Sequence, residues 1–296
     1  MDIKTQQDAF ALLAAGATHG DATAMYAVSA CHRTTPRRAS GTRKAAAKDY
    51  AAAMNNLGRF YEHGEGVPQD YGKAREWFEK AAAKDVAAAM YNLGVLFGNG
   101  EGVPQDYAKA REWYEKAAAK DSSDAMLNLG ALFVNGLGVP QDYTKAREWY
   151  EKAADKGDAS AKMALERLPM REAAMAGRYD EALRLAEAFA AKLEAEETKR
   201  DGRPGEQTAG ELQQMTWYAL FAKDYAKALA VADHAHALFP DNLGIENNRA
   251  HVRMFMGHDE EAKALYLAIK ERSANCRVSY GSKSSLKTLR NSARWA

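Results

Sequence analysis

Hydrophobic and polar residues alternate along most of the chain with the spacing of amphipathic helices. One stripe consists of Met90, Leu93, Leu96 and Phe97. A second stripe, after a short polar segment, consists of Tyr107, Ala110, Trp113, Tyr114 and Ala117. Intervals of three and four residues place each set on one face of a helix. This stretch therefore predicts two consecutive helices, neither of which can bury its apolar face alone.

The two-helix pattern recurs three times almost unchanged, with a period of 36 residues, beginning at Lys48, Lys84 and Lys120. Each copy contains Ala-Met-x-Asn-Leu-Gly, then Gly-x-Gly-Val-Pro-Gln-Asp, then Lys-Ala-Arg-Glu-Trp. A fixed period of this length is typical of stacked helical arrays, in which each copy buries its apolar face against its neighbours. Such an array provides a surface rather than a reaction centre.

The segment between the two stripes contains the signals that end one helix and begin the next. In the middle copy, Gly100 and Gly102 can adopt the left-handed conformation that ends a helix, and Pro104 prevents its continuation. Asp106 is then placed to cap the second helix. The equivalent residues of the other copies are Gly64, Gly66, Pro68 and Asp70, and Gly136, Gly138, Pro140 and Asp142.

A glycine also lies inside each predicted first helix, at Gly58, Gly94 and Gly130. Glycine in a helix interior costs about 1 kcal/mol relative to alanine. We therefore expect it to allow a close approach of the partner helix.

These motifs resemble the Sel-one-like repeat, a relative of the tetratricopeptide repeat. The resemblance covers residues 48–155, and we assign residues 48–165 to these repeats. It implies an all-α fold, an α/α superhelical solenoid of antiparallel helix pairs. It also implies that the protein binds partners, often as an adaptor in bacterial or membrane-associated signalling complexes.

Beyond the repeats, residues 166–270 predict tetratricopeptide-like helix pairs. The short turns at Gly177, Lys223 and Gly257 have the tetratricopeptide form, and the last two are 34 residues apart. Pro240 stands where that family closes its second helix. The polar segment 200–208, interrupted by Gly and Pro, predicts a long loop within the superhelix.

Two segments do not follow the helical period. Residues 1–47 contain a degenerate repeat interrupted by an irregular segment at 28–43, and an irregular tail occupies 271–296. Some codon choices that encode the repeat sequence give the amino acids of residues 28–43 when they are read one nucleotide late. A shifted reading of 269–296 can likewise give an amphipathic helix. We therefore interpret both segments as frame-shifted remnants and expect them to pack poorly. The codons of the gene in these two regions would test this interpretation.

Composition and charge exclude several classes of function. Lys+Arg 41 against Asp+Glu 40 leaves a net charge of +1, so no global field recruits nucleic acid. Apolar runs are too short to span a membrane. Asp2 and Asp8 offset Lys4 at the start of the chain, so we expect no export signal and a cytoplasmic protein, with the periplasm left open.

Candidate chemistry is weak. The Gly-x-Gly loops follow helices and lack the Gly-Lys-Ser/Thr of a phosphate-binding loop. Cys31 and Cys276 lie in the irregular segments, and the histidines do not have metal-ligand spacing. Trp77, Trp113 and Trp149 are at positions expected in the inter-helix core. We therefore predict no enzyme activity, no cofactor and no metal.

The remaining candidate is the concave face formed by the first helix of each copy. The variable positions on this face are Asn55, Arg59, Tyr91, Val95, Leu127 and Ala131. They predict binding of a protein or peptide partner, and neutral drift on a solvent-facing surface explains the same variability. Two alternatives stay open for the chain as a whole: the regulatory or targeting part of a repeat-containing hydrolase, and a decayed copy without a partner.

Overall fold

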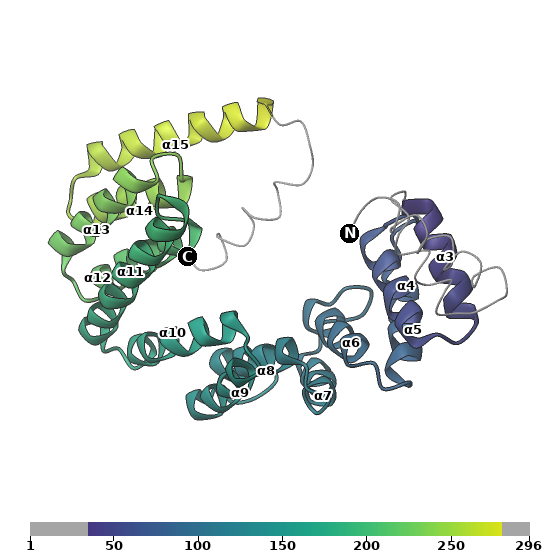
Figure 1. The fold of residues 1–296 in the computed structure, drawn as a ribbon. Coiled ribbons are helices and arrows are strands. Elements are labelled where there is room, and N and C mark those ends of the chain that lie inside the picture. Colours follow the sequence, from purple (N-terminus) through teal and green to yellow (C-terminus); the bar gives the residue numbers. More distant parts are fainter. Residues whose placement is uncertain (1–34, 280–296) are drawn as a thin grey trace. The chain divides into compact units, whose positions relative to one another are not determined.

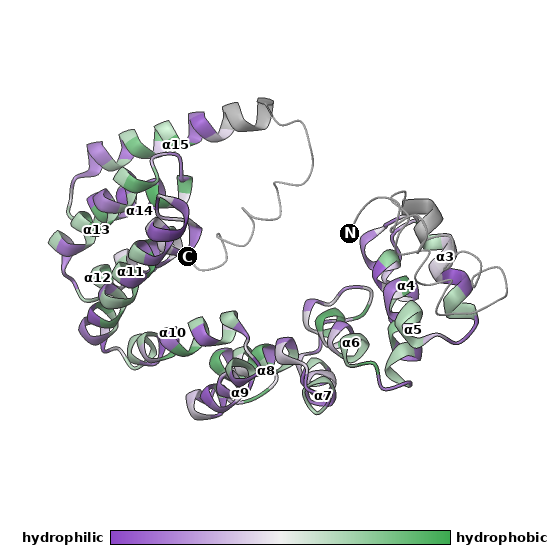
Figure 2. Ribbon diagram, viewed as in Figure 1, coloured by the Kyte–Doolittle hydropathy of each residue, from purple (hydrophilic) through white to green (hydrophobic). Residues whose placement is uncertain are grey.

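The computed structural model describes residues 35–279. Within this range the chain forms thirteen α-helices and no β-strand (Figure 1). Successive helices pack against each other within residues 35–155 and within residues 179–279. The predicted all-α class, a solenoid of antiparallel helix pairs, is therefore confirmed. Green apolar positions alternate with purple polar ones along the helices (Figure 2), as expected where each helix buries a single stripe.

The chain divides into two compact units, Met1–Leu165 and Glu166–Ala296, and the division falls within helix α10 (Ala159–Met175). Pro169 lies inside this helix and has no backbone N–H, so the carbonyl of Leu165 receives no helical hydrogen bond from it. The helical ladder is thus interrupted where the chain passes from the first unit to the second unit.

The first unit contains the three periodic copies. Its helices are α3 (Thr35–Ala47), α4 (Ala51–His63), α5 (Tyr71–Ala82), α6 (Ala87–Asn99), α7 (Tyr107–Ala118), α8 (Ser123–Asn135) and α9 (Tyr143–Asp155). Helices α4 and α5, α6 and α7, and α8 and α9 form the three pairs, and α5 and α7 also pack against the first helix of the next pair. The leucine of each Asn-Leu-Gly motif is fully buried, at Leu57, Leu93 and Leu129.

The loops between paired helices confirm the predicted end and start signals. Gly100 follows α6 in the left-handed conformation, with φ of 71°, and its backbone N–H donates to the carbonyl of Leu96. The carboxylate of Asp106 accepts a hydrogen bond from the backbone N–H of Lys109 at 3.0 Å and caps α7. The same two devices occur at Gly64 and Asp70, and at Gly136 and Asp142.

The glycine inside each first helix makes room for an aromatic ring. A Cβ added to Gly94 would lie 2.4 Å from the ring of Tyr114 on α7, and one added to Gly58 would lie 2.5 Å from the ring of Phe78. Gly130 meets Tyr150 in the same way, at 2.3 Å. The expected close approach of the partner helix is therefore made by a side chain rather than by its backbone.

Contacts between copies repeat as regularly as the copies themselves. In the second and third copies the second glycine of the loop packs on the preceding pair. A Cβ on Gly102 would lie 2.5 Å from Cβ of Tyr71, and one on Gly138 would lie 2.7 Å from the backbone carbonyl carbon of Tyr107. An aspartate in the left-handed conformation precedes each pair and binds a lysine 35 residues further on. These ion pairs join Asp49 to Lys84, Asp85 to Lys120 and Asp121 to Lys156.

The second unit contains the remainder of α10 and helices α11 (Tyr179–Asp201), α12 (Glu206–Phe221), α13 (Tyr225–Leu238), α14 (Leu243–Phe255) and α15 (Asp259–Ser279). Each of α11 to α14 packs against the next helix, and α12 also packs against α14. The predicted short turns are confirmed at Gly177, Lys223 and Gly257, all with positive φ. Helix α13 ends at Leu238, just before Pro240, as predicted.

The predicted long loop at 200–208 is wrong in its extent. Helix α11 continues to Asp201 and α12 begins at Glu206, so only residues 202–205 connect them. The buried carboxylate of Glu197 holds this connection, because it accepts hydrogen bonds from the backbone N–H of Gly205 at 2.6 Å and from the hydroxyl of Thr208 at 2.6 Å. The buried carboxylate on α11 therefore fixes the conformation of a segment whose Gly and Pro residues had predicted a long loop.

Two predicted irregular segments are partly helical. Helix α3 includes residues 35–43, and its Ala39 and Thr42 are 1% exposed, because small residues at three- and four-residue spacing form a face that packs on α4. Helix α15 continues through Ser279, and Arg272 on it pairs with Asp241 at 2.8 Å. The prediction that the two irregular segments pack poorly is therefore wrong for Ala39, Thr42 and Arg272. Residues 28–34 and 280–296, where the rest of that prediction falls, lie outside the described residues, as does the predicted absence of an export signal.

Candidate functional site

The six predicted contact residues lie in pairs on the first helices of the three copies. They are Asn55 and Arg59 on α4, Tyr91 and Val95 on α6, and Leu127 and Ala131 on α8. Residues four apart share one side of a helix, so each pair lies on a single face. Arg59 is exposed, whereas the four residues on α6 and α8 are half-buried. The first-helix face, as we call these positions, is thus apolar on α6 and α8, with a cation on α4.

Asn55 differs from the other five because it is buried. It is 8% exposed, and its amide oxygen accepts a hydrogen bond from the amide of Asn92 at 3.0 Å. Asn55 is therefore the buried member of the first-helix face, and it joins α4 to α6.

Tyr91 is held in place by groups from two other helices, α7 and α8. Its ring centroid lies 5.9 Å from that of Tyr114 on α7, and the side chain of Asn128 on α8 hydrogen-bonds both hydroxyl groups. Burial raises the pKa of the Tyr91 hydroxyl and that of the Tyr114 hydroxyl, so both are neutral at physiological pH. The first-helix face therefore presents an aromatic group of fixed position and no charge.

The repeated tryptophans occupy a different side of the copies. Each packs partly against the core, and a lysine three residues on lies over its ring, with Lys116 Nζ 4.0 Å from the centroid of Trp113. The corresponding distance is 4.2 Å at both Trp77 and Trp149. The tryptophans are therefore half-buried against the core rather than fully inside it as predicted, and each ring also contacts a cation.

The repeats match a known family model. The model of the Sel1 repeat matches residues 51–86, 87–122 and 123–158, and each match begins at the first helix of a pair. The chain carries three Sel1 repeats. The first-helix face is accordingly built from the first helices of these three repeats.

Solved structures of repeat proteins share the fold. A protective antigen of uropathogenic Escherichia coli with an SLR fold aligns with a TM-score of 0.53 and 21% identity, over 90% of this chain and 71% of that one. A tetratricopeptide repeat protein from Parabacteroides merdae aligns with a TM-score of 0.53 and 14% identity, over 91% of this chain and 93% of that one. At these identities the likeness shows the fold alone. No curated protein matches the sequence.

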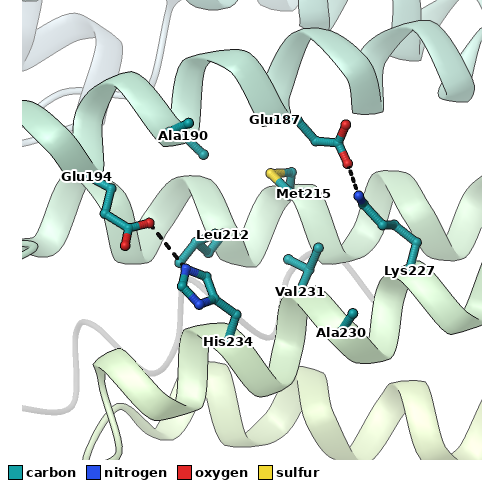
Figure 3. A pocket seen from close by; sticks show the side chains of 10 residues that line it. Glu187, Ala190, Glu194, Leu212, Met215, Lys227, Ala230, Val231 and His234 are labelled. Atoms are coloured by element: carbon teal, nitrogen blue, oxygen red, sulfur yellow. Dashed lines mark hydrogen bonds and ion pairs between the residues drawn. The ribbon is translucent and has the colours of Figure 1, made fainter.

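The second unit contains a pocket that the sequence did not reveal. It has a volume of about 360 Å³ and lies between α11 and α13, above α12 (Figure 3). Leu212, Met215 and Val231 provide an apolar lining. Glu187 pairs with Lys227 at one end, and at the other Glu194 lies 3.1 Å from Nε2 of His234. The arrangement suits an apolar side chain, with the Glu187–Lys227 ion pair at one end and the Glu194–His234 contact at the other.

The second unit also has a row of aromatic side chains that lies outside the 36-residue period. Its members are Tyr179, Phe221, Trp217, His251 and Tyr266, in order of contact. Trp217 and Phe221 are four residues apart on α12, the same spacing as Asn55 and Arg59 on α4. That spacing, followed beyond the 36-residue period, is the signal that could have located them.

Catalytic and metal chemistry receive little support from the described part of the chain. Among residues 35–279, no group of three or more His, Cys, Asp and Glu side chains could hold a metal ion. His234 and His236 bind different carboxylates, those of Glu194 and Glu246. None of the helices described is long and apolar enough to cross a membrane.

Proposed function

We propose that the protein is a non-catalytic scaffold that binds a protein or peptide partner on the first-helix face of its Sel1 repeats. The observation that carries this proposal is the set of half-buried apolar side chains on α6 and α8, namely Tyr91, Val95, Leu127 and Ala131. Apolar side chains that adjacent elements hold partly exposed are typical of interaction surfaces.

The support beneath this face favours recognition over neutral drift. Tyr91 shares Asn128 with Tyr114, and Asn92 donates to the buried Asn55. A side chain held in one position loses little conformational entropy on binding, which favours affinity. We therefore assign Asn55 to positioning the face, and the other five predicted residues to contact with the partner.

The proposal is tested by binding measurements with purified partner. Tyr91→Ala and Leu127→Ala each remove apolar contact area and should weaken binding about tenfold or more, as expected of central interface residues. Glu112→Ala, at an exposed position on the second helix α7, is the matched control and should leave the affinity unchanged. Equal affinities for all three variants and the wild type would show that the partner binds elsewhere.

A further inference from the structure

The pocket between α11 and α13 has walls of small side chains on an apolar floor (Figure 3). The wall residues are Ala190, Ala191 and Ala230, and the floor residues are Leu212, Met215 and Val231. All three floor residues are buried, so packing fixes the base of the pocket. The volume of about 360 Å³ is within the range of small-molecule sites.

Charged side chains close the pocket at its two ends. Glu187 and Glu194 are seven residues apart on α11, and Lys227 and His234 are seven residues apart on α13. At a rise of 1.5 Å per residue, the two ends are therefore about 10 Å apart. Carbon–carbon bonds are about 1.5 Å long, so a chain of about six carbons with one polar end group fits between them.

The charges of the lining favour a cation over an anion. Two carboxylates, Glu187 and Glu194, stand against one ammonium group, that of Lys227, and the imidazole of His234. The summed charge is negative when the imidazole is neutral and zero when it is protonated. In neither state does the lining attract an anion overall.

Charged residues just outside the lining do not change this balance. Beside the Glu187–Lys227 end they are Asp180 and Arg184 on α11, and Lys223 and Asp224 immediately before α13. Each of these two sets contains one anion and one cation. One turn beyond the other end, Thr198 and Leu238 are uncharged. The preference for a cation therefore comes from the pocket itself.

Within the lining, Glu194 is the group best placed to bind a cation. Its Oε2 lies 3.1 Å from Nε2 of His234, whereas its Oε1 has no hydrogen-bond partner among the described residues. Its side chain is 32% exposed, so a ligand can reach it. Glu187 differs, because the ammonium group of Lys227 neutralises it and would repel a second cation.

We propose that this pocket binds a small organic cation of the alkylammonium type. The apolar chain of the ligand lies on Leu212, Met215 and Val231, and its ammonium group donates a hydrogen bond to Oε1 of Glu194. The charge-assisted hydrogen bond orients the ligand, and the flexible side chain of Met215 adapts to its chain. The site belongs to the second unit, so its failure would leave the proposed function of the Sel1 repeats unaffected.

The test compares hexylammonium, hexanol and hexanoate, which share one apolar chain, as probes of the full chain. Ligands of about seven non-hydrogen atoms bind in the millimolar range, so NMR of the Met215 methyl group is a suitable readout. Hexylammonium should bind about three- to tenfold more tightly than hexanol, and hexanoate should bind most weakly. The methyl signals of Met90 and Met126, in the first unit, should not shift.

Two variants with matched controls locate the site. Glu194→Gln should remove the preference for hexylammonium over hexanol, whereas Glu196→Gln, at an exposed position of α11 outside the lining, should retain it. Ala191→Phe should fill the pocket and abolish binding of every probe, whereas Ala188→Phe, also exposed on α11 outside the lining, should not. None of these positions is buried, so the variants should unfold at the wild-type temperature, which separates loss of binding from loss of fold.

A capped lysine amide distinguishes two sources of the ammonium group. Tighter binding of hexylammonium indicates a free amine, tighter binding of the capped lysine indicates a side chain of a partner protein, and both results support the cation site. The proposal is overturned if hexanol or hexanoate binds as tightly as hexylammonium. It is also overturned if Glu194→Gln keeps the preference of the wild type, or if Ala191→Phe binds the probes as well as Ala188→Phe.

Discussion

At the scale of single residues, the repeat is defined by positions where only one residue type fits. Gly94 lies inside α6, where alanine is normally favoured, yet the ring of Tyr114 occupies the space that a Cβ would need. Glycine is a poorer helix former than alanine, but at this position it allows an aromatic contact between the paired helices. Asn55 is a second example, since its hydrogen bond to Asn92 makes a variable position part of the packing.

Gly94→Ala should destabilise the protein by about 1–3 kcal/mol, the usual cost of adding atoms to a packed core. Gly210→Ala in α12 is the matched control, because nothing lies within 4 Å of its added Cβ. That change should stabilise by up to about 1 kcal/mol through helix propensity. Denaturant unfolding measures both, and a neutral or stabilising Gly94→Ala would contradict the contact with Tyr114.

At the scale of elements, two buried carboxylates in the second unit have pKa values shifted in opposite directions. Burial alone would raise the pKa of Glu197, but hydrogen bonds from Thr208 and from the backbone N–H of Gly205 outweigh it and lower the pKa. Burial raises the pKa of Glu211, and Arg167 opposes this shift without cancelling it. Glu197 should therefore stabilise the connection between α11 and α12 when charged, whereas the charge of Glu211 is a cost.

Glu197→Gln should lower the free energy of unfolding by about 1–3 kcal/mol near neutral pH, because an amide cannot accept all the hydrogen bonds of the carboxylate. The pKa of Glu197 is lower in the folded state. Its stabilisation is therefore present above the unfolded pKa of about 4.3 and is lost as the pH falls below it. Unfolding at about pH 7 and about pH 4 should show the difference between wild type and variant shrinking in acid.

The substitution Glu211→Gln should change the free energy of unfolding in the opposite direction. Because the folded pKa of Glu211 is raised, its charge opposes folding above that pKa, and this cost disappears as the pH falls through it. The variant should match or exceed the wild type in stability near neutral pH, since Arg167 is exposed enough to remain hydrated. A clear loss of stability at neutral pH would mean that the ion pair with Arg167 outweighs the burial of Glu211.

Helices and turns could be predicted from sequence where the residues that cause them are close together in the chain. The caps at Asp106 and Gly100 followed from neighbouring residues and were correct. The short connection between α11 and α12 was missed because it depends on Glu197, several residues back on another turn of helix. Helix α3 was missed because Ala39 and Thr42 form a helix face of small residues, a weak signal without the packing of α4.

At the scale of the whole molecule, the chain combines Sel1 repeats in the first unit with tetratricopeptide-like helix pairs in the second. Periodicity predicted the first-helix face, because equivalent positions recur every 36 residues. It could not predict that Asn55 would be buried, since this depends on how α6 stacks on α4. Part of the aromatic row was within reach of the 34-residue spacing of the second unit, which separates Trp217 from His251. Tyr179 and Tyr266 lie on other helices and do not follow that spacing.

Site-specific photo-cross-linking would show whether a partner contacts the first-helix face of the Sel1 repeats. A photoreactive residue at Val95 stands on this face, whereas one at Glu112 is exposed on the second helix of the same repeat. The account predicts a covalent partner adduct from position 95 and none from position 112. An adduct from position 112 alone, with none from position 95, would contradict it.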